Sequence, residues 1–254
     1  MDQEIRKGKY LQRIKFFDRA IADDQTLIKL HRHHIMNVPF ENLDIHYHRL
    51  FDLELPNIYK KVVDNSRGGF CYELNYLFNS LLKAVGFSTK IISSRVFDSE
   101  GVLGPEFDHM SIYVRTDRDY IADVGFGDLF VVPLEIKEGV QDDGRNKFLI
   151  ESNLHGEYTL SMSSDGLNFE KKYVFSLKEV PLEYFKEPCV DKQTNPESYF
   201  VKNTVCTLVT EAGRVTLFND KLIRKNYSER SEISILSDID LRAQLRKNFN
   251  IEIH

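Results

Sequence analysis

The sequence predicts an α+β fold, and changes in the spacing of its apolar residues support this prediction. Over residues 1–89 apolar side chains recur every three or four positions, which is the period of an amphipathic helix. Over residues 90–187 they alternate with polar side chains, and turn-forming residues separate the alternating stretches, as in an antiparallel sheet or small barrel. Residues 188–254 contain both patterns. We therefore expect a helical bundle, an antiparallel β part and a smaller α/β part, in this order.

The helices of the first part have local start and stop signals. Asp23 and Asp24 are candidate N-caps for a helix whose apolar face follows them. Pro56 suits the first turn of a short helix, where its missing N–H costs nothing. A further helix begins near Cys71, where apolar residues start to recur, and Gly86 is its stop signal.

The strands are expected in short alternating stretches between glycines and other turn residues. The final part predicts a hairpin that turns at Ala212–Gly213 and a last helix with Leu241, Leu245 and Phe249 on one face. The expected strands of the central part are KIISSRVF, HMSIYVR, YIADVG, FVVPLEI, KFLIESN, EYTLSMSS and KKYVFSL.

The composition of the chain indicates which kinds of molecule the protein binds. The chain has 254 residues, 42% of them hydrophobic, and this is enough for a substantial core. Its net charge of −5 and lack of long basic runs argue against nucleic acid or a membrane surface as the main partner. The first ten residues lack the apolar stretch of a signal peptide, and no later stretch approaches the roughly 18 apolar residues of a membrane span. We expect a cytoplasmic protein that acts on small molecules.

Cys71 is the strongest candidate for a reactive group. It follows Gly68 and Gly69 in "NSRGGFCYELN" and stands at the expected start of a helix, where free N–H groups and the helix dipole favour a thiolate. Arg67 adds a positive charge nearby, and the two glycines allow a close approach that could bring a substrate carbonyl to the sulfur. We therefore expect the pKa of Cys71 to be lowered. The alternative is a small buried apolar residue.

A catalytic cysteine needs a base and a group that orients it, and His109 and Asp123 are the candidates. They lie on two expected strands joined by a turn at residues 116–118. A three-residue turn makes opposed positions sum to an even number, so Asp123 faces Ser111 and lies diagonal to His109 on the same side of the sheet. A two-residue turn would place them on opposite sides. Taken singly, both residues could be ordinary polar groups at strand ends.

The other chemical groups of the sequence predict no metal site. The only cysteines besides Cys71 are Cys189 and Cys206, and no CxxC spacing occurs, so neither a disulfide framework nor a cysteine zinc site is indicated. The densest group of histidines lacks a carboxylate or cysteine to complete a ligand set. We interpret these histidines as solvated residues on helix faces: His31, His33, His34, His46 and His48.

Four stretches together resemble the arylamine N-acetyltransferases: "VPFENLDI", "RGGFCYELN", the strand of His109 and "DVGFG". "YLQRI" near the N-terminus and "NPESYF" to "TEAGRV" near the C-terminus extend the resemblance over most of the chain. It implies a helical bundle (1–89), a β-barrel (90–187) and an α/β lid (188–254) around a cysteine-protease-like core. It also implies a Cys71, His109, Asp123 triad, acetyl-CoA as acyl donor and no metal.

The resemblance also implies roles for residues that spacing alone would not single out. Phe126 and Phe130 would line the pocket for an arylamine or hydrazine, although both could be plain core residues. Thr207, beside Cys206 on an expected strand of the lid, is a candidate coenzyme contact, and the alternative is a plain strand residue. The turn at residues 116–118 is one residue shorter than is common in the family, and Asp128 follows "GFG" where a neutral or basic residue is frequent, so the preferred amine is not specified.

Arg67 has a second possible role. In the family an arginine of this loop pairs with the acidic residue of the "PFENL" segment, which here is Glu41, and Asp44 offers a second carboxylate. A guanidinium between two carboxylates would fix the loop before Cys71. We favour this structural role over a direct electrostatic one.

The function that we predict is a ping-pong acetyl transfer through an acetyl-cysteine. Two alternatives use the same residues or the same fold. A cysteine hydrolase or a transglutaminase-like enzyme would use the triad on amides, and a binding protein of this fold would carry out no reaction. Neither a Walker motif nor GxGxxG occurs, so a nucleotide-binding mode of those kinds has no support.

Overall fold

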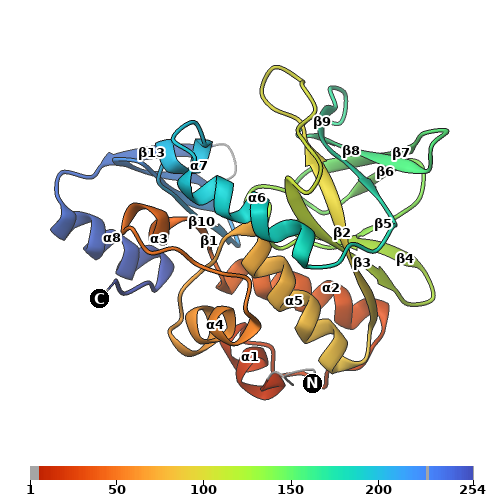
Figure 1. The fold of residues 1–254 in the computed structure, drawn as a ribbon, viewed down its shortest axis with the longest axis horizontal. Helices are drawn as coiled ribbons and strands as arrows, with labels where there is room; N and C mark the ends of the chain where they lie inside the picture. Colours follow the sequence, from red (N-terminus) through yellow and green to blue (C-terminus); the bar gives the residue numbers. More distant parts are fainter. Residues whose placement is uncertain (1–5, 227–228, 254) are drawn as a thin grey trace.

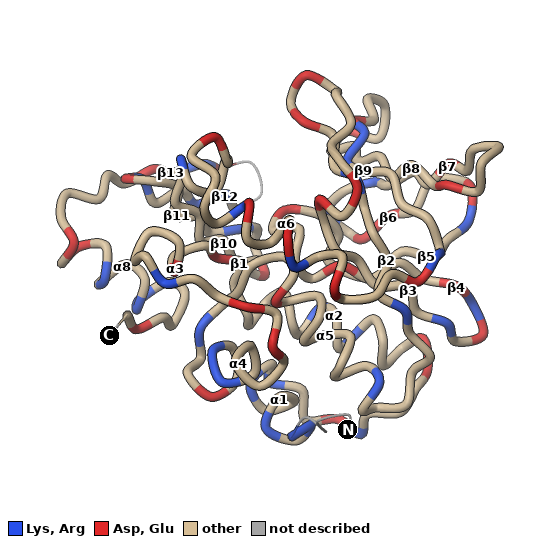
Figure 2. Tube along the Cα trace, in the orientation of Figure 1, with Lys and Arg blue, Asp and Glu red and all other residues tan. Residues whose placement is uncertain are grey.

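The structure is a computed structural model that describes residues 6–226 and 229–253. Helices, an eight-stranded antiparallel sheet and a five-stranded sheet lie side by side, which confirms the predicted α+β fold (Figure 1). Acidic and basic residues are interleaved along the chain (Figure 2). Within the described ranges no helix has the length and apolar character needed to cross a membrane.

The helical part surrounds one central helix. Helix α5 (Cys71–Val85) begins at the predicted residue and ends at Gly86, whose φ of 115° lies in the left-handed region. Asp23 caps α2 (Asp24–Asn37), because its carboxylate accepts the N–H of Thr26 at 2.7 Å. The shorter elements are α1 (Lys7–Arg13), α3 (Leu43–His46), α4 (Leu55–Tyr59) and a π-helical turn, η1 (Lys60–Asp64).

Helix α5 joins the helical part to the barrel. It contacts β2 and β3 on one side and α1 and α4 on the other, so it is buried nearly all round. Its residues Leu77 and Phe78 belong to the same apolar cluster as Met110 and Ile112 of β3. The N-terminus of α5 is thereby held against the strand that carries His109.

The eight strands form a nearly closed barrel, in the order β5-β4-β3-β2-β9-β8-β7-β6. The Gln141 side chain links the two edge strands, because its carboxamide accepts the Glu135 N–H at 3.0 Å and donates to the Glu135 carbonyl at 2.8 Å. The strands are β2 (Ser88–Val96), β3 (His109–Arg115), β4 (Asp119–Ala122), β5 (Leu134–Glu135), β6 (Val140–Asp142), β7 (Lys147–Ser152), β8 (Glu157–Ser163) and β9 (Glu170–Ser176).

The turn between β3 and β4 has the predicted length. Arg115 pairs with Asp119 and Ile112 pairs with Ala122, so the turn is residues 116–118 and opposed positions sum to an even number. The register prediction that places Asp123 and His109 on one side of the sheet is confirmed.

The lid contains a second sheet, and the helical part contributes a strand to it. The short β1 (Phe40–Glu41) pairs with β10, which gives the order β1-β10-β11-β12-β13. The lid elements are α6 (Glu183–Thr194), α7 (Tyr199–Lys202), β10 (Val205–Thr210), β11 (Gly213–Phe218), β12 (Lys221–Asn226), β13 (Glu229–Ser234) and α8 (Asp238–Phe249).

Some boundaries differ from the sequence expectations: of the expected strand FVVPLEI only Leu134–Glu135 pairs as β5, and the expected strand YIADVG ends at Ala122. The hairpin turn is Glu211–Ala212, one residue earlier than predicted, because Gly213 already pairs with Thr210. A side chain on Gly213 would collide with the carbonyl of Lys225, and glycine permits this close pairing. The expected domain boundaries fall inside β2 and inside α6, and the outermost ends of the chain lie outside the described residues. The division into domains stays a prediction.

Candidate active site

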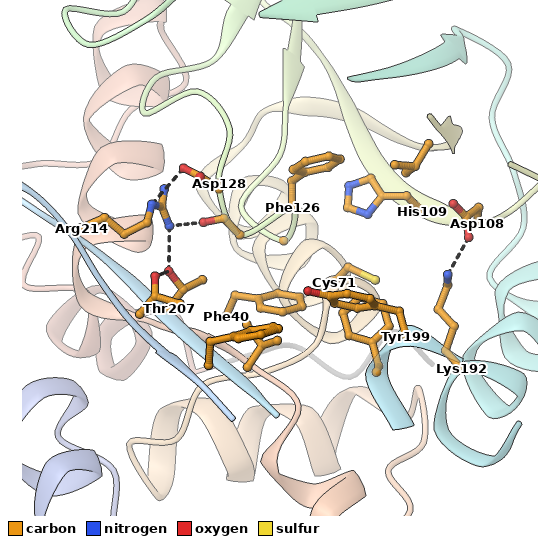
Figure 3. Close-up of a pocket in the computed structure, with 17 residues that line it drawn as sticks. Phe40, Cys71, Asp108, His109, Phe126, Asp128, Lys192, Tyr199, Thr207 and Arg214 are labelled. Atoms are coloured by element: carbon orange, nitrogen blue, oxygen red, sulfur yellow. Dashed lines mark hydrogen bonds and ion pairs between the residues drawn. The ribbon is translucent and has the colours of Figure 1, made fainter. Parts of the chain in front are cut away.

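Cys71 opens into a cavity of about 390 Å³ between the helical part, the barrel and the lid. Figure 3 shows Cys71 and His109 in this cavity, between an ion pair of Arg214 with Asp128 at one end and an ion pair of Lys192 with Asp108 at the other. Much of its wall is aromatic, formed by Phe40, Phe126, Tyr199, Phe200 and Phe218.

The nucleophile candidate sits at the first residue of α5 with 5% of its surface exposed. The helix start is fixed because Glu73 accepts the backbone N–H of Phe70 at 2.8 Å. Gly125 packs directly on the Cys71 backbone, and a Cβ on Gly125 would lie 2.7 Å from the Cys71 carbonyl oxygen. Only glycine fits there, so the segment after Asp123 can lie against Cys71.

His109 has one ring nitrogen committed to Asp123 and the other available to the thiol. Its Nε2 lies 2.7 Å from Oδ2 of Asp123, which leaves Nδ1 for Cys71. The ring packs edge-on against Phe126, with 5.4 Å between ring centroids, and it also contacts Tyr173. These contacts restrain the plane of the ring on the wall of the cavity that Cys71 also lines.

Asp123 is buried, and both of its carboxylate oxygens accept hydrogen bonds. Its second carboxylate oxygen accepts hydrogen bonds from the side chain of Asn75 at 2.8 Å and from the backbone N–H groups of Gly125 and Phe126 at 2.9 and 3.1 Å. Burial tends to raise the pKa of this carboxyl, but the charge of His109 and the hydrogen bonds outweigh it and hold the pKa below its usual range. The carboxylate therefore stays ionised and can stabilise an imidazolium.

The pKa of Cys71 differs from the sequence expectation. Burial raises the pKa of the thiol well above its usual value, and Lys192 is the main cation that opposes this. Arg67 does not act on the sulfur, because its guanidinium faces other groups. The prediction of a lowered pKa is therefore wrong for the thiol taken alone.

Arg67 is the centre of a buried charge network next to the loop that precedes Cys71. Its guanidinium donates to Glu41 at 2.8 and 3.0 Å and to Asp44 at 2.9 Å. Lys61 links Asp44, at 2.7 Å, to Glu73, at 2.9 Å. Burial tends to raise the pKa of Asp44, but Lys61 and Arg67 hold it below its usual value. The network connects the "PFENL" segment to the first turn of α5.

The glycines before Cys71 serve packing in the structure. A Cβ on Gly68 would collide with the carbonyl oxygen of Pro39 and lie 2.6 Å from Cγ of Glu41. Gly69 forms a parallel bridge with Phe40. The expected role of Gly68 in substrate approach is therefore wrong, because its open side is filled by the chain itself.

The predicted binding residues lie in different surroundings. Phe126 and Thr207 line the cavity, and Thr207 Oγ1 accepts a hydrogen bond from Arg214 at 3.1 Å. Phe130 does not line this cavity. It is 2% exposed and packs against His31 and Phe148, with ring centroids 5.5 and 5.9 Å away.

The charged side chains Asp108, Lys192 and Arg214 at the cavity were missed by the sequence prediction, whereas Asp128 was noted there for its bearing on the preferred amine. Lys192 and Arg214 come from the lid, and their ion pairs with Asp108 and Asp128 are 2.5 and 2.9 Å long. Asp108 directly precedes the predicted His109, and this position was the signal available in the sequence. Lys192 is far from the other site residues in sequence, Arg214 lies seven positions after Thr207, and no local pattern marks either of them.

Two of the histidines that were expected to be solvated are buried in the structure. His31 and His34 are fully buried, so the interpretation of these two as solvated residues is wrong. His31 contacts the backbone of Asp123 and Val131, and Nδ1 of His34 hydrogen-bonds the Tyr10 hydroxyl at 2.9 Å. In the part of the chain that the structure describes, no group of three or more His, Cys, Asp or Glu residues is arranged to hold a metal.

A cysteine at a helix start, a histidine beside it and a buried carboxylate behind the histidine define an enzyme of the acyl-transferring cysteine class. Comparisons with known proteins identify the family. A family model described as N-acetyltransferase matches residues 23–254. The pineal gland arylamine N-acetyltransferase isozyme NAT-3 of Gallus gallus is 32% identical, over 96% of this chain and 93% of the relative. The chain belongs to the arylamine N-acetyltransferase family.

Solved structures have the same fold. The Mycobacterium smegmatis arylamine N-acetyltransferase is 27% identical and superposes with a TM-score of 0.89, covering 98% of this chain and 93% of that one. The Mycobacterium marinum arylamine N-acetyltransferase in complex with CoA is 24% identical, with a TM-score of 0.87 over 96% of this chain and 92% of that one.

Proposed function

We propose that this enzyme transfers an acetyl group from acetyl-CoA to an arylamine or arylhydrazine by a ping-pong mechanism. Cys71 is the nucleophile, His109 the acid and base, and Asp123 the group that orients His109. The observation that carries the proposal is that Cys71 and His109 line one cavity while His109 Nε2 lies 2.7 Å from Asp123, so that Nδ1 is the ring nitrogen that the thiol would use.

In the first half-reaction the Cys71 proton passes to His109 Nδ1, and the thiolate attacks the carbonyl carbon of the donor thioester. The tetrahedral intermediate collapses, the bond from carbon to the CoA sulfur breaks, and the leaving thiolate takes the proton from His109. The exchange of one thioester for another is nearly balanced in energy. Asp123 favours this route because it stabilises the imidazolium while the proton is on His109.

In the second half-reaction the acceptor amine attacks the acetyl-cysteine. His109 takes a proton from the nitrogen, the bond from carbon to sulfur breaks, and Cys71 leaves as a thiolate that recovers this proton. A weakly basic arylamine attacks a thioester far more readily than an amide, so the covalent intermediate is the activated form of the acetyl group. The chemistry needs no metal.

The cavity walls suit a flat aromatic acceptor. Phe40, Phe126 and Phe200 contribute apolar ring surface near Cys71, and such surfaces favour stacked or edge-on rings. Phe126 would contact the acceptor. Phe130 packs behind the same loop, so we now propose that it supports Phe126 and does not itself touch the acceptor.

Thr207 is proposed as a coenzyme contact at the lid side of the cavity. Its hydroxyl is held by Arg214 and Thr216, at 3.1 and 2.8 Å, so it is presented at a fixed position. The relative from M. marinum binds CoA within the same fold, and this supports acetyl-CoA as the donor here. A cytoplasmic location would keep the Cys71 thiol reduced, as the mechanism requires.

Initial-rate kinetics test the proposal. With acetyl-CoA and 4-methoxyaniline varied together, a ping-pong enzyme gives parallel double-reciprocal lines. Intersecting lines would contradict an acetyl-enzyme on the reaction path. Turnover of a glutamine peptide without acetyl-CoA would favour a cysteine hydrolase or a transglutaminase-like enzyme, and no turnover of either substrate would favour a binding protein.

A further inference from the structure

The backbone of Asp123 lies just beyond the end of β4, and the buried ring of His31 hydrogen-bonds to it. Strand β4 ends at Ala122, so the peptide groups of Asp123 lie beyond the strand pairing. His31 of α2 takes the place of a strand partner, because its Nε2 lies 3.0 Å from the Asp123 carbonyl oxygen and 3.3 Å from the Asp123 nitrogen. A buried peptide group without such a partner would be costly.

The same ring also holds the other end of the loop that begins at Asp123. Nδ1 of His31 lies 3.3 Å from the carbonyl oxygen of Val131, and the Val131 N–H donates to Asp143 at 2.8 Å. The His31 ring stacks on Phe130 at 5.5 Å, with 25° between the ring planes. One side chain therefore bridges both ends of loop 123–131, which carries Phe126 into the cavity.

Either neutral tautomer of His31 bonds the Asp123 peptide. In one, Nε2–H donates to the Asp123 carbonyl. In the other, Nε2 accepts the Asp123 N–H and Nδ1–H donates to Val131. Burial lowers the pKa of His31 to about 4, so the ring stays neutral at neutral pH. Asp123 and Asp143 are the charged groups that face it.

We propose that His31 is a positioning residue for acetyl transfer: it fixes the backbone of Asp123 so that the carboxylate meets His109, and it fixes the loop that presents Phe126. This inference rests on the proposed role of the triad. The carboxylate reaches His109 over a single short contact of 2.7 Å, so a small displacement of the Asp123 backbone would weaken the pair directly.

His34 provides a matched control. It lies on the same helix, is equally buried and packs edge-on against Phe78 as His31 does. Its Nδ1 bonds the Tyr10 hydroxyl. A change at His34 therefore disturbs the same part of the core without removing a bond to Asp123 or Val131.

The test measures acetylation of Cys71 by acetyl-CoA in single turnover, and the pH midpoint of Cys71 alkylation by iodoacetamide. His31→Phe keeps the ring and removes both nitrogens. We expect it to slow acetylation at saturating donor by about tenfold to a hundredfold, without raising the apparent Kd for acetyl-CoA, and to shift the alkylation midpoint. His34→Phe should leave both readouts within about twofold of the parent enzyme, on the same reasoning.

Two amide variants distinguish the contact of Nε2 with Asp123 from the contact of Nδ1 with Val131. They also test the proposal if His31→Phe does not fold. His31→Gln can reach Asp123, as Nε2 does, and should keep most of the rate. His31→Asn reaches only the Val131 side and should lose it. Equal rates for the two amides, a parental rate and midpoint for His31→Phe, or an equal loss in His34→Phe would overturn the inference. If acetyl-CoA does not acetylate the parent enzyme, the proposed function fails, and the iodoacetamide midpoints still test the positioning of the triad.

Discussion

Arg67→Gln should destabilise the enzyme strongly while leaving the chemistry of Cys71 nearly unchanged. The guanidinium makes three hydrogen bonds to Glu41 and Asp44, and the side chain of Glu41 is fully buried. Glutamine cannot supply the charge, so two carboxylates would remain in the interior with Lys61 as their nearest cation.

The expected loss of stability in Arg67→Gln follows from the burial of the ion pairs that Arg67 makes. Removing one partner of a buried ion pair typically costs about 3–5 kcal/mol. Arg67 and Asp44 retain side-chain exposures of 9% and 11%, so water can partly solvate the carboxylate that is left. We therefore expect a loss of about 2–4 kcal/mol for Arg67→Gln, and a similar loss for Glu41→Gln. The double variant should lose at least about 1 kcal/mol less than the sum, because the second change removes a pair that is already broken.

Urea unfolding of the four proteins measures this cycle, with the slope of each transition checked for equality. The exposed pair of Arg242 and Asp238 on α8 is the control, and its cycle should be additive. Iodoacetamide alkylation should give the same pH midpoint for Cys71 with and without Arg67. An additive cycle at Arg67 and Glu41 would refute the structural role, and a raised midpoint with unchanged stability would restore the electrostatic one.

Three further predictions concern the site itself. Asp123→Asn should keep the fold, as judged by circular dichroism, and lose activity on the order of 10⁴-fold, whereas near-parental single-turnover rates would remove Asp123 from the mechanism. Asp128→Asn would leave Arg214 at the cavity wall without its carboxylate, so that Arg214 could pair with a carboxylate on the acceptor. We therefore expect the ratio of kcat/KM for 4-aminobenzoate over 4-aminobenzamide to rise by about tenfold. An unchanged ratio would place the acceptor elsewhere. Burial lowers the pKa of His31 from 6.5 to about 4, so the unfolded chain binds a proton first and stability should fall as pH decreases from 6.5 towards 4. This dependence amounts to about 3 kcal/mol, and it should be weaker in His31→Phe when urea midpoints are compared across the range.

Local patterns in the sequence were sufficient to predict the frame of the site. The spacing of apolar residues located the start of α5 at Cys71, and the parity of a three-residue turn placed Asp123 and His109 on one side of the sheet. Both inferences depend only on the regular periods of helices and strands, which neighbouring residues determine.

Several features that depend on contacts between distant segments were not predicted, whereas the pairing of Arg67 with Glu41 and Asp44 was expected from the family resemblance. The ion pairs of Lys192 and Arg214 join the lid to the rest of the site, and no local pattern encodes them. Phe130 follows Phe126 by only four residues, but Gly127, with a φ of 91°, lies between them and the two rings enter different surroundings. The burial of Cys71, which reverses the expected direction of its pKa, likewise arises only when three parts of the chain close over it.

The central claim is that Cys71 carries the acetyl group between donor and acceptor. The most direct measurement is the intact mass of the enzyme after exposure to acetyl-CoA without an amine, followed by peptide mapping. We predict one added acetyl group, located on Cys71, that disappears when 4-methoxyaniline is added and never forms in Cys71→Ala. An enzyme that stays unmodified while it acetylates the amine, or an acetyl group on Cys189 or Cys206, would contradict the account.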